Sequence, residues 1–442
     1  MHAKLGDLWW YTILLFVAQR FGDVINMFVG LWIVPKYVPM EELGAVLPLT
    51  SVVGLIGVPL SIVSIPFLKF IAVFAEKKEY GKAKALIRDT FIGTGVFAVL
   101  SILIACFVLP FFFERLRVQN GNLAFLLVVV TVLTAVSCIF GNAIAALRLF
   151  NFSVWFQAIS APFRLLLMAA LMPFRPLSGY VAGGAAAPGV NILGSIFALR
   201  KFWRSAGRPA PYWCEYKSAI WRYTWPLIIM TVVSAITANM DMLVIRHRLC
   251  DFESAGYYMI TRFSEISVQL GSAFVAFLMP LLAARNGDDA EARKMTFHSV
   301  VGVLSVGLLL SALLASFGRP LLGLRNEWAT YASLTPHMVA LSVNSAVGMA
   351  GSCISTAFTA RGRFGFLWYC LGIGIAKSVL LYAVTGYTFF AGWVPDAWLD
   401  ALAAFNPNRL SVVIWFMSVA NVLTIVFLCV EAFVPKRVSL KG

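Results

Sequence analysis

Long apolar segments recur along the whole chain and leave few folds open to it. Hydrophobic residues make up 60% of the 442 residues and charged residues only 12%, a balance that excludes a soluble globular protein. A stretch of roughly 20 apolar residues is long enough to cross a bilayer as a helix. Twelve segments meet this criterion, at residues 8–34, 44–74, 88–113, 122–148, 152–173, 179–203, 218–246, 254–284, 296–318, 329–359, 364–391 and 409–434. We therefore predict an all-α, polytopic membrane protein with about twelve transmembrane helices.

The basic residues in the loops and near the ends of these spans favour one side of the membrane. If the N-terminus is cytoplasmic, 21 Lys and Arg residues fall on that side and nine on the other. Lys and Arg collect in the cytoplasmic loops of membrane proteins, so we expect both termini to be cytoplasmic. The first apolar segment is too long for a cleaved signal peptide, and we expect it to be retained as a helix.

Other function classes are disfavoured by composition. The net charge of +15 is carried by the loops and follows the sidedness of the chain, so it does not predict a nucleic-acid partner. Seven cysteines are scattered without a CxxC pair, and four histidines are equally dispersed. The sequence therefore predicts no disulfide framework, no metal site and no cofactor.

The two halves of the sequence repeat one another. The Tyr-Thr pair at 11–12 recurs at 223–224, and the Glu-x-x-Gly pattern at 41–44 recurs at 253–256, both at an offset of 212 positions. An even number of helices per repeat preserves direction, so the repeats are parallel, as in transporters whose two halves enclose the substrate path. The predicted organisation is an N-terminal lobe of six spans (1–203), a cytoplasmic linker (204–217) and a C-terminal lobe of six spans (218–442).

Seven ionisable residues fall well inside the predicted spans, where a charge is costly and usually functional. They are Arg20, Asp23, Arg164, Asp241, Arg262, Glu265 and Lys377. Because four are basic and three are acidic, the membrane interior carries a small positive excess.

Two interpretations of these charges stay open. Arg20 with Asp23, and Arg262 with Glu265, have the i, i+3 spacing of neighbours on a helix, so each is either a self-neutralised structural pair or part of a site. Arg164 and Lys377 have no partner in their own spans, which makes them the strongest candidates for binding an anion.

The seventh span adds a further polar position. Asn239 precedes Asp241 in that span. The two residues are either a polar patch, a cation-coupling site or simple interhelical hydrogen-bonding groups.

Short motifs resemble a known family of exporters. They are Glu41-Glu42-Leu43-Gly44 after the first span, and, in the second half, Trp225-Pro226, Asn239-Met240-Asp241, Glu253-Ser254-Ala255-Gly256-Tyr257-Tyr258, Phe277-Leu278-Met279-Pro280 and the charged loop at 287–294. Together they resemble the polysaccharide-transporter branch, including O-antigen flippases, of the multidrug/oligosaccharidyl-lipid/polysaccharide exporter superfamily. The first turn lacks the usual Gly-Pro of that branch. Twelve spans, instead of the fourteen typical of lipid II flippases, disfavour a peptidoglycan role.

The resemblance implies a function and roles for the charged residues. It implies a flippase of the bacterial inner membrane that carries an undecaprenyl-diphosphate-linked oligosaccharide by alternating access, as a monomer among membrane lipids. Four cations are expected to bind the head group: Arg20, Arg164, Arg262 and Lys377. Four other residues are expected to balance charge or couple an ion, H⁺ or Na⁺: Asp23, Asn239, Asp241 and Glu265.

Two other functions compete with this interpretation. The first is a cation-coupled multidrug exporter of the same superfamily, whose pocket would be acidic instead of basic. The second is a polytopic polysaccharide polymerase or glycosyltransferase, which needs catalytic groups in a sizeable external loop. The longest external connection, 392–408, is a short apolar segment with two aspartates, so the chain is predicted not to be an enzyme.

Overall fold

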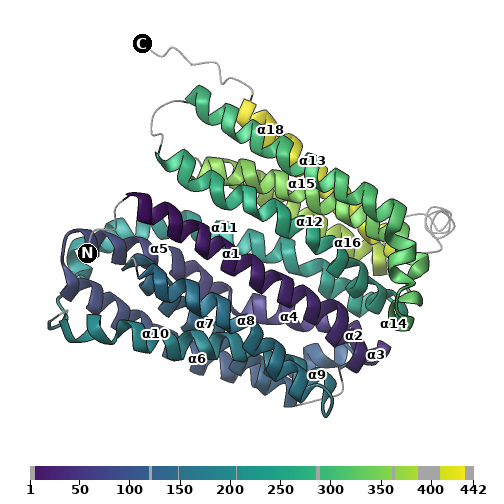
Figure 1. The fold of residues 1–442 in the computed structure, drawn as a ribbon, viewed down its shortest axis with the longest axis horizontal. Helices are drawn as coiled ribbons and strands as arrows, with labels where there is room; N and C mark the ends of the chain where they lie inside the picture. The colour runs from purple at the N-terminus through teal and green to yellow at the C-terminus, as the bar shows by residue number, and fades with distance from the viewer. Residues whose placement is uncertain are drawn as a thin grey trace. The chain divides into compact units, whose positions relative to one another are not determined.

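A computed structural model describes residues 5–118, 122–147, 149–205, 207–284, 289–360, 364–386 and 409–433. All regular secondary structure in these ranges is helical (Figure 1). The predicted external connection at 392–408, both chain termini, residues 287 and 288 of the charged loop and the predicted span ends at 148, 387–391 and 434 lie outside the described residues.

The first half of the chain contains the following helices: α1 (Leu5–Phe28), the π-helix η1 (Val29–Ile33), α2 (Val34–Tyr37), α3 (Met40–Leu43), α4 (Val46–Ile56), α5 (Val58–Glu76), α6 (Tyr80–Arg115), α7 (Asn122–Ala146), α8 (Phe150–Leu171), α9 (Pro176–Gly184) and α10 (Ala186–Ser205). The second half contains α11 (Trp213–Arg248), α12 (Asp251–Ala284), α13 (Asp289–Leu322), α14 (Asn326–Ala329), the 3₁₀-helix η2 (Ala332–Leu334), α15 (Thr335–Ala360), α16 (Phe366–Gly386) and α18 (Arg409–Phe433).

Each of the twelve predicted spans corresponds to one helix or to consecutive helices. Eight helical segments in the described part of the chain are long and apolar enough to cross a membrane by themselves. The helices α11 and α12 are long but carry several charged residues, which lowers their average hydropathy. The predicted all-α, multi-pass membrane architecture is confirmed.

The second span is divided into two helices. Helix α4 ends at Ile56, and Gly57 joins it to α5, which has a proline in its first turn. Proline lacks the N–H that would continue the hydrogen-bond ladder, so a helix readily bends or breaks at this point. The Gly57 N–H still donates to the Val53 carbonyl oxygen at 3.0 Å, which closes the last turn of α4.

The chain divides into two compact units, Met1–Ala235 and Ile236–Gly442, which we call the N-terminal and C-terminal units. The boundary lies within α11. The predicted linker, 204–217, contains the non-helical residues 207–212 between α10 and α11. The division into lobes at 203 and 218 stays a prediction.

In the N-terminal unit, α7 packs against α5, α6 and α10, and α8 packs against α1 and α10 (Figure 1). Fully buried side chains from α5, α7 and α10, including Ile71, Phe74, Ile144 and Leu199, form one hydrophobic core. These are large apolar residues, whose burial within the protein is typical of interiors. The core fixes these helices against one another.

In the C-terminal unit, α15 packs against α12, α13 and α18 (Figure 1). Gly307 of α13 faces Ala346 of α15 so closely that a β-carbon at position 307 would overlap the Ala346 side chain. Small residues permit such close approach of membrane helices. A chain of buried hydroxyls joins the same helices, since the Ser342 Oγ lies 2.8 Å from that of Ser267 and 3.0 Å from that of Ser311.

The connection 207–212 and the start of α11 are bound to the rest of the N-terminal unit. The Ala210 N–H donates to the Gly81 carbonyl oxygen at 3.0 Å. The Lys82 Nζ lies 2.6 Å from the Glu215 Oε2, and the hydrogen bond from Lys82 lowers the pKa of Glu215. Tyr212 packs edge-on against the Phe74 ring. These contacts hold the first turns of α11 against α5 and α6.

Candidate functional site

The polar face of α1 carries Arg20, Asp23 and Asn26 at intervals of three residues, so the three side chains follow one another along the helix. The Arg20 Nη1 lies 3.1 Å from the Asp23 Oδ2, and the two side chains are 22% and 27% exposed. The Arg20 guanidinium also lies over the Phe16 ring, 5.1 Å from its centroid. The two charges therefore neutralise one another within α1, in accordance with one of the interpretations that the sequence left open.

Arg164 of α8 has a neutral partner. Its Nη1 donates to the Asn26 Oδ1 at 3.1 Å, across the contact between α8 and α1. One turn away, Gly22 and Ala161 let the two helices approach closely. Within the part of the chain that the structure describes, Arg164 has no ion pair, and its half-buried side chain leaves Nε without a hydrogen-bond partner. Its positive charge is therefore not balanced by a carboxylate among those residues.

The second i, i+3 pair also forms an ion pair. On α12, the Arg262 Nη1 lies 2.6 Å from the Glu265 Oε2, with side-chain exposures of 17% and 32%. The Arg262 guanidinium lies 5.2 Å from the centroid of the Tyr258 ring. This pair repeats in the C-terminal unit the arrangement of Arg20, Asp23 and Phe16 in the N-terminal unit.

Asp241 and Lys377 form a buried charged cluster in the C-terminal unit. Asp241 of α11 is 4% exposed and Lys377 of α16 is 6% exposed, and their opposite charges interact. The Tyr257 hydroxyl donates to the Asp241 Oδ2 at 3.4 Å. The Asp241 Oδ1 has no hydrogen-bond partner within the described ranges. The cluster therefore places the lysine that lacked a partner in the sequence within electrostatic range of an aspartate on another helix.

Asn239 lies outside the face of α11 that carries Asp241. The two residues are two positions apart, and such residues point to different sides of a helix. Asn239 is half-buried. The helix geometry therefore disfavours a single polar patch made of the Asn239 and Asp241 side chains.

The predicted charges thus form separate sets in the two units. In the N-terminal unit, Arg20 and Asp23 cancel and Arg164 adds one positive charge. In the C-terminal unit, Arg262 with Glu265 and Lys377 with Asp241 sum to zero formal charge. The small positive excess that the sequence shows inside the membrane is therefore located at Arg164.

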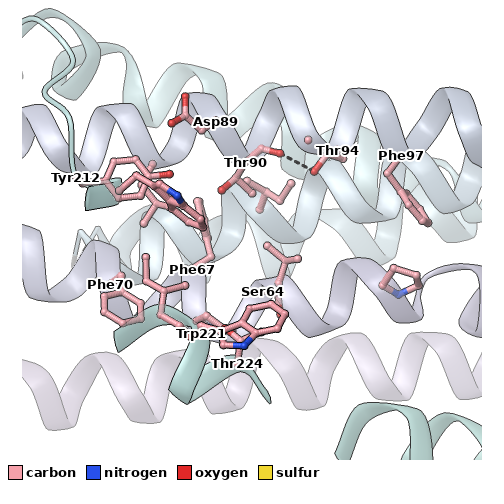
Figure 2. Close-up of a pocket in the computed structure, with 18 residues that line it drawn as sticks. Ser64, Phe67, Phe70, Asp89, Thr90, Thr94, Phe97, Tyr212, Trp221 and Thr224 are labelled. Atoms are coloured by element: carbon pink, nitrogen blue, oxygen red, sulfur yellow. Dashed lines mark hydrogen bonds between the residues drawn. The ribbon is translucent and has the colours of Figure 1, made fainter. Parts of the chain in front are cut away.

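The N-terminal unit also contains a cavity of about 630 Å³ between α5, α6 and the start of α11, in the size range of ligand sites. Figure 2 shows Asp89, Thr90, Thr94 and Phe97 along one side, with Trp221 across the cavity. The lining is mainly apolar, and its aromatic side chains come from all three helices. We call this cavity the aromatic groove.

Sequence analysis missed three parts of these sites. Asn26 could have been found, because it follows Arg20 and Asp23 on one helical face. Tyr257 could not have been predicted as a hydrogen-bond donor to Asp241, because that contact depends on how α11 and α12 pack. The aromatic groove left no signal, since its phenylalanines and tryptophans are common on any lipid-facing helix.

No protein-family model matches the sequence, and comparison with curated proteins finds no match either. Solved structures do match. An inward-facing multidrug resistance MATE family transporter of the MOP superfamily is 13% identical, with a TM-score of 0.67 over 93% of this chain and 94% of that one. A MATE structure in the straight conformation is 13% identical, with a TM-score of 0.62 over 95% of this chain and 94% of that one.

The lipid II flippase MurJ, in an inward closed conformation, is also similar, with 12% identity and a TM-score of 0.61 over 95% of this chain and 87% of that chain. Both MATE transporters and MurJ are MOP-superfamily proteins. At these identities the likeness concerns the fold. The chain therefore has an all-helical fold similar to that of these transporters, as the sequence predicts.

Proposed function

We propose that this protein, with the fold of MOP-superfamily transporters, flips an undecaprenyl-diphosphate-linked oligosaccharide across the bacterial inner membrane by alternating access. In this proposal the cations Arg20, Arg164, Arg262 and Lys377 serve the diphosphate head group. The remaining polar residues, Asp23, Asn239, Asp241 and Glu265, balance charge or couple H⁺ or Na⁺. The protein acts as a monomer with both termini in the cytoplasm.

One observation carries the proposal, namely the unbalanced positive charge of Arg164. A diphosphate loses its hydration when it enters the membrane, and a guanidinium can replace it with paired hydrogen bonds. Arg164 is half-buried, and Asn26 holds it by one nitrogen only. Its Nε is buried and has no hydrogen-bond partner among the described residues, so the guanidinium keeps unused hydrogen-bonding capacity.

The other cations fit less direct roles. Arg20 and Arg262 are partly exposed but already bound to carboxylates, so a phosphate would add to an existing pair. Lys377 is buried beside Asp241, which favours charge balancing over direct contact with the head group. Arg164 is therefore the residue on which the substrate assignment depends.

A cation-coupled multidrug exporter is the alternative that one observation favours. The Asp241 Oδ1 is buried and has no hydrogen-bond partner in the part of the chain that the structure describes, and a buried carboxylate oxygen of this kind can bind a proton or Na⁺. This feature supports ion coupling for either substrate. The excess charge at Arg164 favours an anionic passenger over an organic cation.

The test is translocation of an undecaprenyl-diphosphate-linked oligosaccharide in vesicles that contain purified protein. Arg164→Gln should lower the rate about tenfold to a hundredfold, because a hydrogen bond to a charged group contributes about 1.5–3 kcal/mol. Arg175→Gln is the matched control, since Arg175 is exposed at the start of α9 and should leave the rate unchanged. Equal rates for both variants, or drug efflux without lipid translocation, would overturn the assignment.

A further inference from the structure

The aromatic groove has a mainly apolar surface. Phe67 and Phe70 of α5, Phe97 of α6 and Trp221 of α11 line it. Two hydroxyls of the lining already donate to backbone groups. The Thr94 hydroxyl donates to the Thr90 carbonyl oxygen at 2.9 Å (Figure 2). Thr224 likewise donates to a backbone carbonyl oxygen of its own helix. The groove therefore offers hydrocarbon and aromatic surface to an occupant.

The dimensions of the groove match one leaflet of a bilayer. Along α6 it extends from Leu86 to Phe97, which at about 1.5 Å per residue is roughly 16 Å. The hydrocarbon part of one leaflet, which is half of a core about 30 Å thick, has about the same length. Asp89 and Tyr212 lie at the end near the loops, and Pro59 lines the end nearest the start of α5.

In a membrane protein, an apolar recess of this kind is filled by hydrocarbon and not by water, since water there would find no hydrogen-bond partners. The groove lies between three helices, α5, α6 and α11. Its length along α6 suits a hydrocarbon chain that runs from a head group into one leaflet.

The polar end of the groove is suited to a phosphate. Lys217 lies four residues from both Trp213 and Trp221, so it shares the face of α11 that lines the groove. Lys217 and Arg88 are both exposed. The negative charge of Asp89 is balanced by an ion pair, because the Arg88 Nη2 lies 2.8 Å from the Asp89 Oδ1. Burial of the Tyr212 side chain is the main reason why its pKa is raised to about 12, and the interaction with Asp89 is the second. Tyr212 therefore stays neutral and can form hydrogen bonds.

We propose that the aromatic groove binds the polyprenyl chain of the lipid-linked substrate, with its phosphate near Arg88 and Lys217. The inference rests on the proposed function and assigns the lipid part of that substrate to a site. The chain enters from the leaflet on the side of the basic loops, which the distribution of Lys and Arg predicts to be cytoplasmic. The groove then holds the lipid while the head group moves between the polar sites.

Two glycines of α6 provide a matched pair of variants. A β-carbon at Gly93 or at Gly95 would meet no atom within 4 Å, so larger side chains fit at both positions without a clash at the helix. Gly93 lines the groove and Gly95, two positions further on, does not. Leucine also has a higher helix propensity than glycine. Gly93→Leu therefore fills the groove, and Gly95→Leu adds the same side chain beside it.

The experiment measures lipid retained by purified full-length protein in native mass spectrometry, with undecaprenyl phosphate or phosphatidylglycerol as the probe. Wild type and Gly95→Leu should retain undecaprenyl phosphate in preference to phosphatidylglycerol, and Gly93→Leu should retain at least about tenfold less of it. Equal retention by all three proteins would overturn the inference. Equal retention of phosphatidylglycerol with the same loss in Gly93→Leu would also overturn it, because the groove would then hold ordinary membrane lipid.

The vesicle assay separates failure of this inference from failure of the proposed function. If wild type translocates the lipid-linked oligosaccharide and Gly93→Leu does so at an equal rate, the groove is not the lipid site while the function stands. If wild type neither translocates the oligosaccharide nor retains undecaprenyl phosphate, the function itself is wrong. A selective loss of both activities in Gly93→Leu, with Gly95→Leu unaffected, supports the assignment.

Discussion

The buried pair of Asp241 and Lys377 makes the sharpest prediction about stability. Both side chains are less than 7% exposed, so removing one charge leaves the other uncompensated in a medium of low dielectric constant. Breaking a buried pair in this way costs about 3–5 kcal/mol. Asp241→Asn and Lys377→Met should therefore each lower the free energy of unfolding by an amount of this order.

The double variant Asp241→Asn/Lys377→Met should recover most of that loss, because replacing both members of a buried pair is often neutral or stabilising. The coupling energy from the double-mutant cycle should then be at least about 2 kcal/mol. The assay is reversible unfolding of the purified protein in mixed detergent micelles, followed by circular dichroism.

The pair of Arg262 and Glu265 is the matched control. Its side chains are 17% and 32% exposed, and partly exposed pairs contribute only about 0.2–1 kcal/mol. The cycle Arg262→Met with Glu265→Gln should give a coupling energy in that range. If the Asp241 and Lys377 substitutions were additive within about 0.5 kcal/mol, the two residues would not act as a buried pair, and the account of this cluster would be refuted.

Two further predictions concern packing and pH. Gly307→Ala should lower the free energy of unfolding by about 1–3 kcal/mol, because the new β-carbon overlaps Ala346. Gly372→Ala is the control, since Gly372 has open space around it, and it should not destabilise the protein. Equal losses of stability in the two variants would contradict this account of the packing. The pKa of Glu215 is lowered by Lys82, so their contact is complete above the usual pKa of Glu, about 4.3, and is lost as the pH falls through the lowered value. Glu215→Gln should therefore speed amide hydrogen exchange in residues 207–216 at neutral pH, and unchanged exchange would show that the contact does not hold this segment.

The local features of the charged sites could be predicted from the sequence. Arg20 with Asp23 and Arg262 with Glu265 are neighbours on their own helices, and the i, i+3 spacing is sufficient to bring them together. Apolar length was likewise sufficient to predict the spans. These features depend on residues within one or two helical turns.

Long-range partners could not be predicted. Arg164 and Asn26 are 138 positions apart. Lys377 and Asp241 lie on different helices and interact electrostatically, so helix packing decides both relationships. The sequence therefore presented Arg164 and Lys377 as equivalent unpartnered cations. In the structure one has a neutral amide partner and the other a buried carboxylate, and only the first carries excess charge.

The division of the second span at Gly57 has a mechanical consequence. Pro59, two residues beyond that joint, lines the aromatic groove at the start of α5. The residues of the second span that line the groove belong to α5 and not to α4, so a bend at residue 57 moves the first part of the span while this wall of the groove keeps its place. The joint thus separates movement of α4 from the surface that α5 offers to a lipid.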